Sequence, residues 1–260
     1  MSSAEAFFLP DGDGRYVATP LTRGPWDPGA QHAGPPSALL GRAIEAYEPR
    51  EDMVVARVGV DILRPVPVAT FEVATRIRRP GRNVELVEAS LQTDGVEVMR
   101  AAAWRIRRTD PDARPTSPTP PPPGPATVAP VATEQWVGEG YLKAMDWRFV
   151  AGDFGQAGPA VAWLRMRHPL VAGEEPSPLT RVLVAADSGN GISGVLNFER
   201  FYAINTDLTV HLHRMPQGEW VCLDATTTVD HDGVGLAASR ISDQESVIGH
   251  GLQSLFVGRR

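Results

Sequence analysis

The sequence stretch with the clearest chemical potential is VLVAADSGNGISG, residues 182–194. Its glycines, Gly189, Gly191 and Gly194, have the G-x-G-x-x-G spacing of a dinucleotide-binding loop, and a short apolar run precedes them. The same stretch places a carboxylate, Asp187, at the end of that apolar run. A phosphate loop and a catalytic carboxylate predict different enzymes, so the surrounding elements must decide between them.

A dinucleotide loop needs a strand before it, a helix that opens on its third glycine, and an acidic residue about 20 positions later. Asp207 lies near that position. However, only about 70 residues follow the first glycine, and they read as antiparallel strands, without the further strand–helix units of a dinucleotide-binding domain. We therefore expect the glycines to mark a helix exit, where glycine readily adopts the left-handed C-cap conformation.

Composition narrows the class of protein. The chain has 260 residues, is 42% hydrophobic and 22% charged, and carries a net charge of −6, which disfavours nucleic acid as a partner. Its single cysteine, Cys222, excludes an intrachain disulfide and a cysteine-rich metal site. The N-terminal residues do not resemble a signal peptide, and no apolar run approaches the ~20 residues that span a bilayer. We expect a cytoplasmic protein without a membrane span.

A proline-rich segment, residues 111–130, divides the chain. Proline recurs there too often for a helix or a central strand, so the segment predicts an extended, semi-rigid linker between residues 1–110 and 131–260. Each side shows a helix followed by strands. Residues 34–47 have apolar positions at helical spacing, and residues 54–62, 71–78, 84–93 and 96–107 suit antiparallel strands. Residues 177–187 repeat the helix, and the strand-like runs 205–214, 219–229, 235–242 and 245–257 follow it. The expected class is α+β, with a duplicated plan of one long helix on an antiparallel sheet.

This arrangement resembles the double hotdog of TesB-type (type II) acyl-CoA thioesterases. The most similar parts are HAGPPSALLGRAIEA and VGVDILRPVPV in the first half, and VAADSGNGIS, NTDLTVHLHR and HGLQSLFVGRR in the second. The resemblance implies that an Asp at the helix, a Thr on the next strand and a Gln on the last strand position the hydrolytic water. The Asp matches Asp187 and the Gln matches Gln253, while the Thr position falls on Asn205, with Thr206 beside it.

Strand alternation favours Asn205 over Thr206, because Asn205 would share a face with Asp207 and Thr209. The corresponding first-half positions (Ser37 or Ala38, Val55 and Trp104) carry no carboxylate or amide. We therefore expect only the second half to supply the catalytic carboxylate.

The expected chemistry is hydrolysis of acyl-CoA by a water that Asp187 activates, with no cofactor and no metal. The backbone N–H of Gly34, at the start of the first helix, is a candidate donor for the oxyanion. Each residue also has a structural interpretation: Asp187 as a helix end, Gln253 as a solvent-facing strand residue, and Asn205 as a turn residue. Two strand histidines, His211 and His213, lack partners at a recognisable metal-ligand spacing.

Three hypotheses follow for the function. The first is an acyl-CoA thioesterase, assembled as a homo-oligomer of double-hotdog subunits. The second is a non-catalytic hotdog protein that binds acyl thioesters. The third, an enoyl hydratase, is less favoured because no histidine follows Asp187 until His211. An arginine cluster, Arg76, Arg78, Arg79 and Arg82, suits either the phosphates of coenzyme A or a solvated hairpin.

Overall fold

The computed structural model describes residues 5–110, 116, 118–133 and 140–260. The helices within these residues are α1 (Gly34–Ala46), α2 (Tyr141–Ala144), α3 (Pro178–Ala186) and α4 (Gly189–Ile192), with short 3₁₀ helices at Pro20–Thr22 and Pro125–Thr127. The first-half strands are β1 (Phe8–Pro10), β2 (Arg15–Ala18), β3 (Met53–Ile62), β4 (Thr70–Arg79), β5 (Val84–Thr93) and β6 (Val96–Arg107). The second-half strands are β7 (Met145–Ala151), β8 (Ala160–Met166), β9 (Phe201–Asn205), β10 (Asp207–Leu212), β11 (Val221–Val229), β12 (Val234–Ser242) and β13 (Val247–Arg259).

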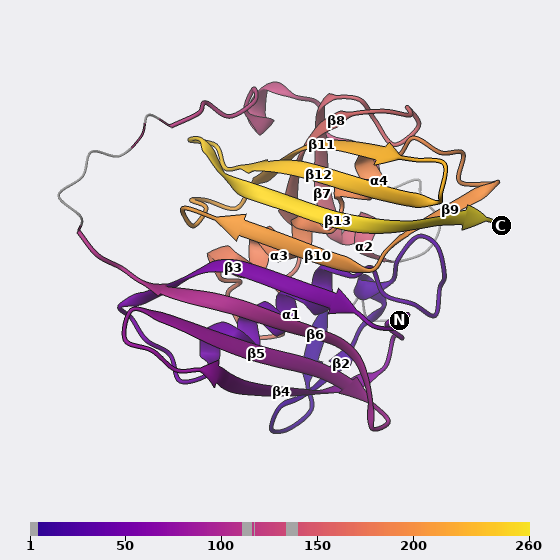
Figure 1. The fold of residues 1–260 in the computed structure, drawn as a ribbon. Coiled ribbons are helices and arrows are strands. Elements are labelled where there is room, and N and C mark those ends of the chain that lie inside the picture. The colour runs from indigo at the N-terminus through magenta and orange to yellow at the C-terminus, as the bar shows by residue number, and fades with distance from the viewer. Residues whose placement is uncertain (1–4, 111–115, 117, 134–139) are drawn as a thin grey trace.

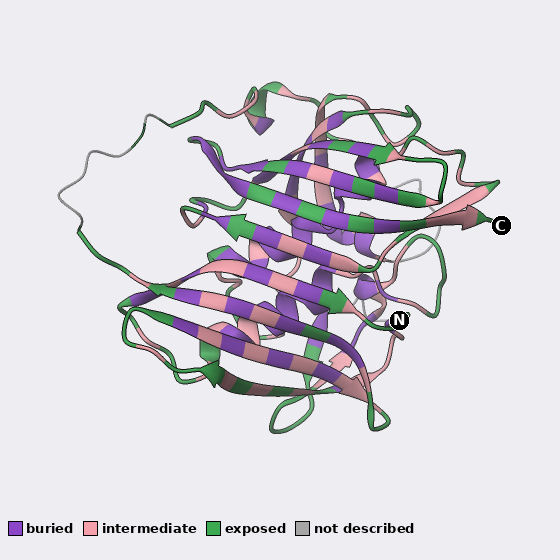
Figure 2. Ribbon diagram, viewed as in Figure 1, coloured by how far each residue is buried: buried purple, intermediate pink, exposed green. Residues whose placement is uncertain are grey.

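All these strands form one antiparallel sheet in the order β1-β2-β4-β5-β6-β3-β10-β13-β12-β11-β8-β7, and β9 pairs with β13. The halves meet at the pairing of β3 with β10, where Val58 lies opposite Val210 and Val60 opposite Leu208. Figure 1 shows this sheet from its outer face, with α1 and α3 behind it. Buried and exposed residues alternate along β12 and β13, as expected for strands with one covered face (Figure 2).

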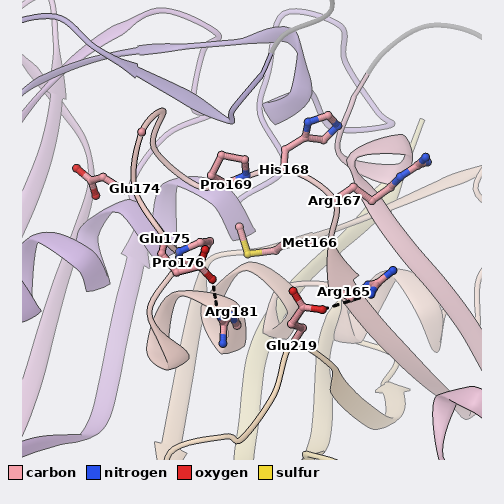
Figure 3. A pocket seen from close by; sticks show the side chains of 11 residues that line it. Arg165, Met166, Arg167, His168, Pro169, Glu174, Glu175, Pro176, Arg181 and Glu219 are labelled. Atoms are coloured by element: carbon pink, nitrogen blue, oxygen red, sulfur yellow. Dashed lines mark hydrogen bonds and ion pairs between the residues drawn. The ribbon is translucent and has the colours of Figure 1, made fainter.

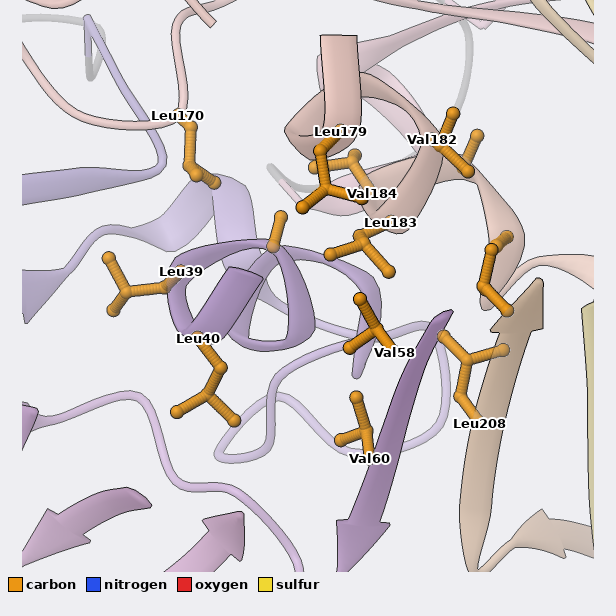
Figure 4. Packing of buried hydrophobic residues seen from close by; sticks show 14 of the residues in the cluster. Leu39, Leu40, Val58, Val60, Leu170, Leu179, Val182, Leu183, Val184 and Leu208 are labelled. Atoms are coloured by element: carbon orange, nitrogen blue, oxygen red, sulfur yellow. The ribbon is translucent and has the colours of Figure 1, made fainter. Parts of the chain in front are cut away.

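The core lies between the helices and the inner face of the sheet. Leu39 and Leu40 of α1 and Leu183 of α3 are fully buried, and they belong to one apolar cluster with strand residues such as Val58 and Leu208 (Figure 4). The two helices also pack against each other. The sequence thus places one apolar helix face from each half over a shared sheet.

The helices approach closely because α1 carries glycine at two positions that face α3. A Cβ at Gly34 would collide with the carbonyl oxygen of Val184, and a Cβ at Gly41 would collide with the side chain of Leu183. These glycines lie seven residues apart, about two helical turns, and so share one face of α1. The absence of their side chains brings the start of α1 onto the last turn of α3.

The two helices differ from the expected plan in one respect. The helix expected over residues 34–47 is observed as the 13-residue α1, but α3 has only 9 residues and is followed by the separate α4. The apolar run before the glycines is therefore a helix, which excludes the strand that a dinucleotide loop requires. Two strands that the sequence did not predict precede each of these helices, β1 and β2 before α1, and β7 and β8 before α3.

Part of the proline-rich segment lies outside the described residues, namely 111–115 and 117. The following part contacts the second half. The carbonyl oxygens of Pro123 and Pro125 accept hydrogen bonds from Trp163 and Arg148, at 2.8 and 2.7 Å, and that of Thr119 accepts one from the backbone of Val247. Of the helices in the described residues, none is both long and apolar enough to cross a membrane.

Candidate active site

Asp187 directly follows α3, and its position depends on how that helix begins and ends. Ser177 caps the start, where its hydroxyl accepts a hydrogen bond from the backbone N–H of Thr180, and Pro178 occupies the first helical position. At the other end, the side chain of Asp187 is only 4% exposed. The helix therefore delivers a carboxylate into the interior, where a charge needs hydrogen-bonding partners.

Two side-chain amides meet one oxygen of this carboxylate. The Nδ2 atom of Asn205 donates to Oδ1 of Asp187 at 2.8 Å, and the Nε2 atom of Gln253 donates to the same oxygen at 3.0 Å. Gln253 is 2% exposed, and its Oε1 accepts the backbone N–H of Asn190 at 3.0 Å, which fixes the orientation of its amide. A Cβ on Gly189 would lie 3.0 Å from that Oε1, so this glycine makes room for the amide. The structure thus brings together Asp187, Asn205 and Gln253.

Asn205 reaches Asp187 because of an irregularity between β9 and β10. From Asn205 to Thr209 the chain advances four positions, while its partner β13 advances three, from Leu255 to Leu252. One extra residue reverses which side chains face inward. Asn205 consequently lies on the same face as the buried Leu208, not on that of Thr209 as simple alternation predicts.

Thr206 does not join the cluster. Its backbone N–H donates to the carbonyl oxygen of Ser254 at 3.0 Å, and its hydroxyl lies 3.5 Å from that same oxygen. Of the two residues expected at the threonine position, Asn205 contacts the carboxylate, whereas Thr206 contacts the backbone of Ser254 in β13.

The second carboxylate oxygen meets a histidine that the sequence did not single out. Nδ1 of His32 lies 3.0 Å from Oδ2 of Asp187, and the His32 side chain is 12% exposed. The backbone N–H of Gly34 donates to the same Nδ1 at 3.1 Å, and the N–H groups of Ala33 and Gly34 also hydrogen-bond to the carboxylate. Gly34, expected as an oxyanion donor, is thus engaged with the Asp187–His32 pair.

His32 corrects the expectation that Asp187 has no histidine partner. The histidine comes from the first half, immediately before α1, so a search downstream of Asp187 along the chain could not find it. One signal was present: His32 begins the HAGPPSALLGRAIEA stretch that carries the family resemblance. The site is therefore composite, with the carboxylate and amides from the second half and the imidazole from the first.

Burial shifts the pKa values of Asp187 and His32 in opposite directions. It raises the pKa of Asp187 to about 7, against the hydrogen bonds from Asn205, Gly34, Gln253 and Ala33, which lower it. Burial also lowers the pKa of His32 to about 3, so its imidazole is neutral at pH 7. Above pH 7 the pair is then a carboxylate beside a neutral imidazole, which suits proton abstraction near neutrality.

Comparison with known families identifies the chain. Two family models match it, the acyl-CoA thioesterase C-terminal domain over residues 111–257 and the acyl-CoA thioesterase N-terminal domain over residues 22–106. The chain belongs to the acyl-CoA thioesterase family. It is thus a thioester hydrolase, and the family inferred from its motifs is confirmed.

Solved structures show the same fold as this thioesterase. A protein from Thermobifida fusca, described as a thioesterase II, superposes with a TM-score of 0.77 at 20% identity, covering 98% of this chain and 96% of the other. A hot dog fold protein from Alicyclobacillus acidocaldarius gives 0.76 at 14% identity, with coverage of 98% and 97%. An acyl-CoA thioesterase II, TesB2, from Mycobacterium marinum gives 0.67 at 15% identity, with coverage of 95% and 94%. No match was found among the curated proteins.

A cavity of about 450 Å³ lies at the opposite end of α3 from Asp187. Among the residues that line it, Figure 3 shows Arg181 paired with Glu175, and Arg165 paired with Glu219. Arg181 belongs to the first turns of α3, whereas Asp187 follows the last turn. The residues that line this charged cavity therefore do not include Asp187, Asn205 or Gln253.

The arginine cluster of the first half pairs largely within its own hairpin. Arg76 contacts Glu88 at 2.8 Å, Arg78 approaches the same carboxylate at 3.9 Å, and Arg79 donates to the carbonyl oxygen of Val84. These contacts agree with a solvated hairpin. Within the part of the chain that the structure describes, no three His, Cys, Asp or Glu side chains are grouped so as to hold a metal ion.

Proposed function

We propose that this thioesterase hydrolyses acyl-CoA to a free fatty acid and coenzyme A, with the carboxylate of Asp187 as the general base. The observation that carries the proposal is a buried carboxyl group whose Oδ1 accepts hydrogen bonds from two amides and whose Oδ2 lies 3.0 Å from Nδ1 of His32, with burial raising its pKa to about 7. A base with a pKa near the working pH gives efficient proton transfer.

In the proposed reaction, Asp187 takes a proton from water as the water oxygen bonds to the thioester carbonyl carbon. The tetrahedral intermediate then collapses, the C–S bond breaks, and the proton passes from Asp187 to the sulfur of the leaving coenzyme A. The N–H groups of the α1 N-terminus hold the charged carboxylate, and when Asp187 is protonated its Oδ2–H can donate to Nδ1 of His32.

Asn205 replaces the threonine of the family pattern in this scheme. Its amide nitrogen donates to Asp187 and to the backbone oxygen of Asp207, at 2.8 and 3.3 Å, which leaves its Oδ1 to accept a hydrogen bond from water. A threonine hydroxyl can also donate and accept, so the amide supplies the same two functions. Gln253 has its Oε1 committed to Asn190 and therefore positions the carboxylate, not the water.

The remaining sequence-based predictions stay proposals. We propose that residues 1–110 and 131–260 form two hotdog repeats joined by the linker 111–130, and that subunits assemble as a homo-oligomer in the cytoplasm. The order of elements supports the duplication, since each half has two strands, a helix and then further strands.

The test is release of free thiol from a panel of acyl-CoA substrates of increasing chain length. We expect turnover of at least one member of the panel. Tight binding of acyl-CoA without thiol release would instead favour the non-catalytic binding protein. Because His32 supplies the histidine partner of Asp187 that the hydratase hypothesis lacked, the panel includes an α,β-unsaturated acyl-CoA. Loss of its double bond without thiol release would indicate hydration.

A further inference from the structure

Tyr141 contacts both sides of the catalytic pair from a third element. It begins α2 and is fully buried, and its ring stacks on the imidazole of His32, with centroids 3.7 Å apart and planes 10° from parallel. Its hydroxyl oxygen lies 2.8 Å from the carbonyl oxygen of Val184 and 2.8 Å from Oγ of Ser188. One side chain therefore joins the imidazole to the helix end that carries Asp187.

The directions of these hydrogen bonds follow from proton count. The tyrosine hydroxyl has one hydrogen, which it donates to the carbonyl of Val184, so Ser188 must donate to the tyrosine oxygen. Burial raises the pKa of Tyr141, which keeps that hydrogen in place. The hydroxyl is thus anchored at two points on the last turn of α3 and the residue after Asp187.

The ring of Tyr141 also packs against another aromatic ring. It makes a T-shaped contact with the buried Trp147 of β7, with centroids 6.0 Å apart and an interplanar angle of 81°. A side chain held at its hydroxyl and packed at its ring presents a fixed flat face to His32. An imidazole otherwise has a broad range of rotation about its second side-chain torsion.

We propose that Tyr141 is a positioning residue that keeps the His32 imidazole aligned with Oδ2 of Asp187 and keeps bulk water, beyond the one reacting molecule, from this pair. The proposal rests on the proposed function of Asp187. The groups that face the carboxylate are His32, the amides of Asn205 and Gln253, and the N–H groups of Ala33 and Gly34, and the buried phenol of Tyr141 is the other titratable group beside the pair. Removing the flat face lets the imidazole rotate and admits water to the carboxylate.

Two substitutions distinguish the effect of the stacked ring of Tyr141 from the effect of its hydroxyl. Tyr141→Leu removes both, and we expect kcat to fall roughly 10- to 100-fold, because small misplacements of catalytic groups have effects of this size. Water that reaches Asp187 also lowers its pKa, so the acid limb of the kcat/KM profile moves to lower pH. Tyr141→Phe keeps the stacked face, and we expect its acid limb to stay near that of the wild type.

A second measurement does not depend on turnover. In an NMR titration, with the His32 resonances assigned by comparison with His32→Gln, we expect His32 to stay neutral to about pH 3 in the wild type. In Tyr141→Leu its titration moves up toward the ordinary pKa of about 6.5.

Phe71→Leu is the matched control, because Phe71 is an equally buried aromatic residue in β4. It lowers Tm without moving the acid limb or the His32 titration. The proposal is overturned if Tyr141→Leu behaves like Phe71→Leu, with a lower Tm but an unchanged limb and titration. A wild-type protein that releases no thiol would instead defeat the proposed function, and the His32 titration would still decide the role of Tyr141.

Discussion

The substitution Asp187→Asn isolates the proposed base from its structural role. Asn keeps an oxygen at the Oδ1 position, so it still accepts the two amide hydrogen bonds from Asn205 and Gln253. Its new NH₂ group takes the place of Oδ2 and can donate to Nδ1 of His32. The contacts with Asn205, Gln253 and His32 are therefore kept, while the group that removes a proton from water is lost.

The expected loss follows from that difference. General base catalysis contributes typically 10²–10⁴-fold, so kcat at pH 8 should fall by about that factor. The pKa of Asp187 at about 7 adds a signature in the wild type, because the carboxylate is the active form. Below pH 7, kcat/KM of the wild type should fall about tenfold per pH unit. The residual activity of Asp187→Asn should lack this limb.

The assay is thiol release from the best acyl-CoA of the panel between pH 5 and 9, with Tm measured for each variant. Asp232→Asn is the matched control, because it makes the same chemical change at an exposed carboxylate in the turn before β12. It should leave both the rate and the limb unchanged. An Asp187→Asn protein that folds and retains the wild-type rate, or retains the limb near pH 7, would refute the reasoning.

Three further predictions test the surroundings of the site. Asn205→Ala removes a hydrogen bond to a charged group, worth about 1.5–3 kcal/mol, so kcat/KM should fall roughly 10- to 150-fold, and Asn205→Thr should recover part of that loss in the same assay. Gly34→Ala forces a Cβ against a backbone carbonyl of α3 and should cost about 1–3 kcal/mol of unfolding free energy in urea titrations, whereas Gly191→Ala, whose Cβ meets open space, should not show this packing loss. Asp243 is fully buried, and although burial raises its pKa, the ion pair with Arg214 and three backbone N–H groups outweigh burial and lower that pKa to about 2. Its folded pKa is below the unfolded value of about 3.9, so its contribution to stability is present above pH 4 and is lost as the pH falls through 2. Arg214→Met should therefore destabilise the protein by about 3 kcal/mol at pH 7 and by less at pH 2, and an equal loss at both pH values would contradict this role.

The sequence predicted the elements with strong periodicity. The apolar spacing of residues 34–47 corresponds to α1, and the alternation over residues 54–62 corresponds to β3. By contrast, β1 has three residues and β2 has four, too few for a period-two pattern to stand out, and the buried stretch of β8 is continuous, so it does not alternate. Pattern alone therefore favoured the long half-buried strands and missed β1, β2 and β8.

For the site, local reasoning favoured Asn205, the residue that contacts Asp187, but for the wrong reason. Alternation favoured Asn205 over Thr206 by grouping it with Thr209, yet Asn205 contacts Asp187 because an extra residue before Thr209 reverses the faces. A bulge depends on how two distant strands pair, and the sequence of one strand does not contain that information. The family pattern located the position, and tertiary pairing explains how Asn205 reaches Asp187.

The sequence analysis missed His32 for a more general physical reason. Asp187 comes from the second half, whereas His32 and the N–H groups of Ala33 and Gly34 come from the first, so the carboxylate acquires its raised pKa only when α1 lies against α3. That contact in turn depends on the missing side chain of Gly34, which allows the carbonyl of Val184 to approach. Packing between the halves and the proton affinity of the base are therefore coupled. A substitution that separates α1 from α3 should lower the pKa of Asp187 as well as the stability of the fold, because water would replace the groups that now bury the carboxylate.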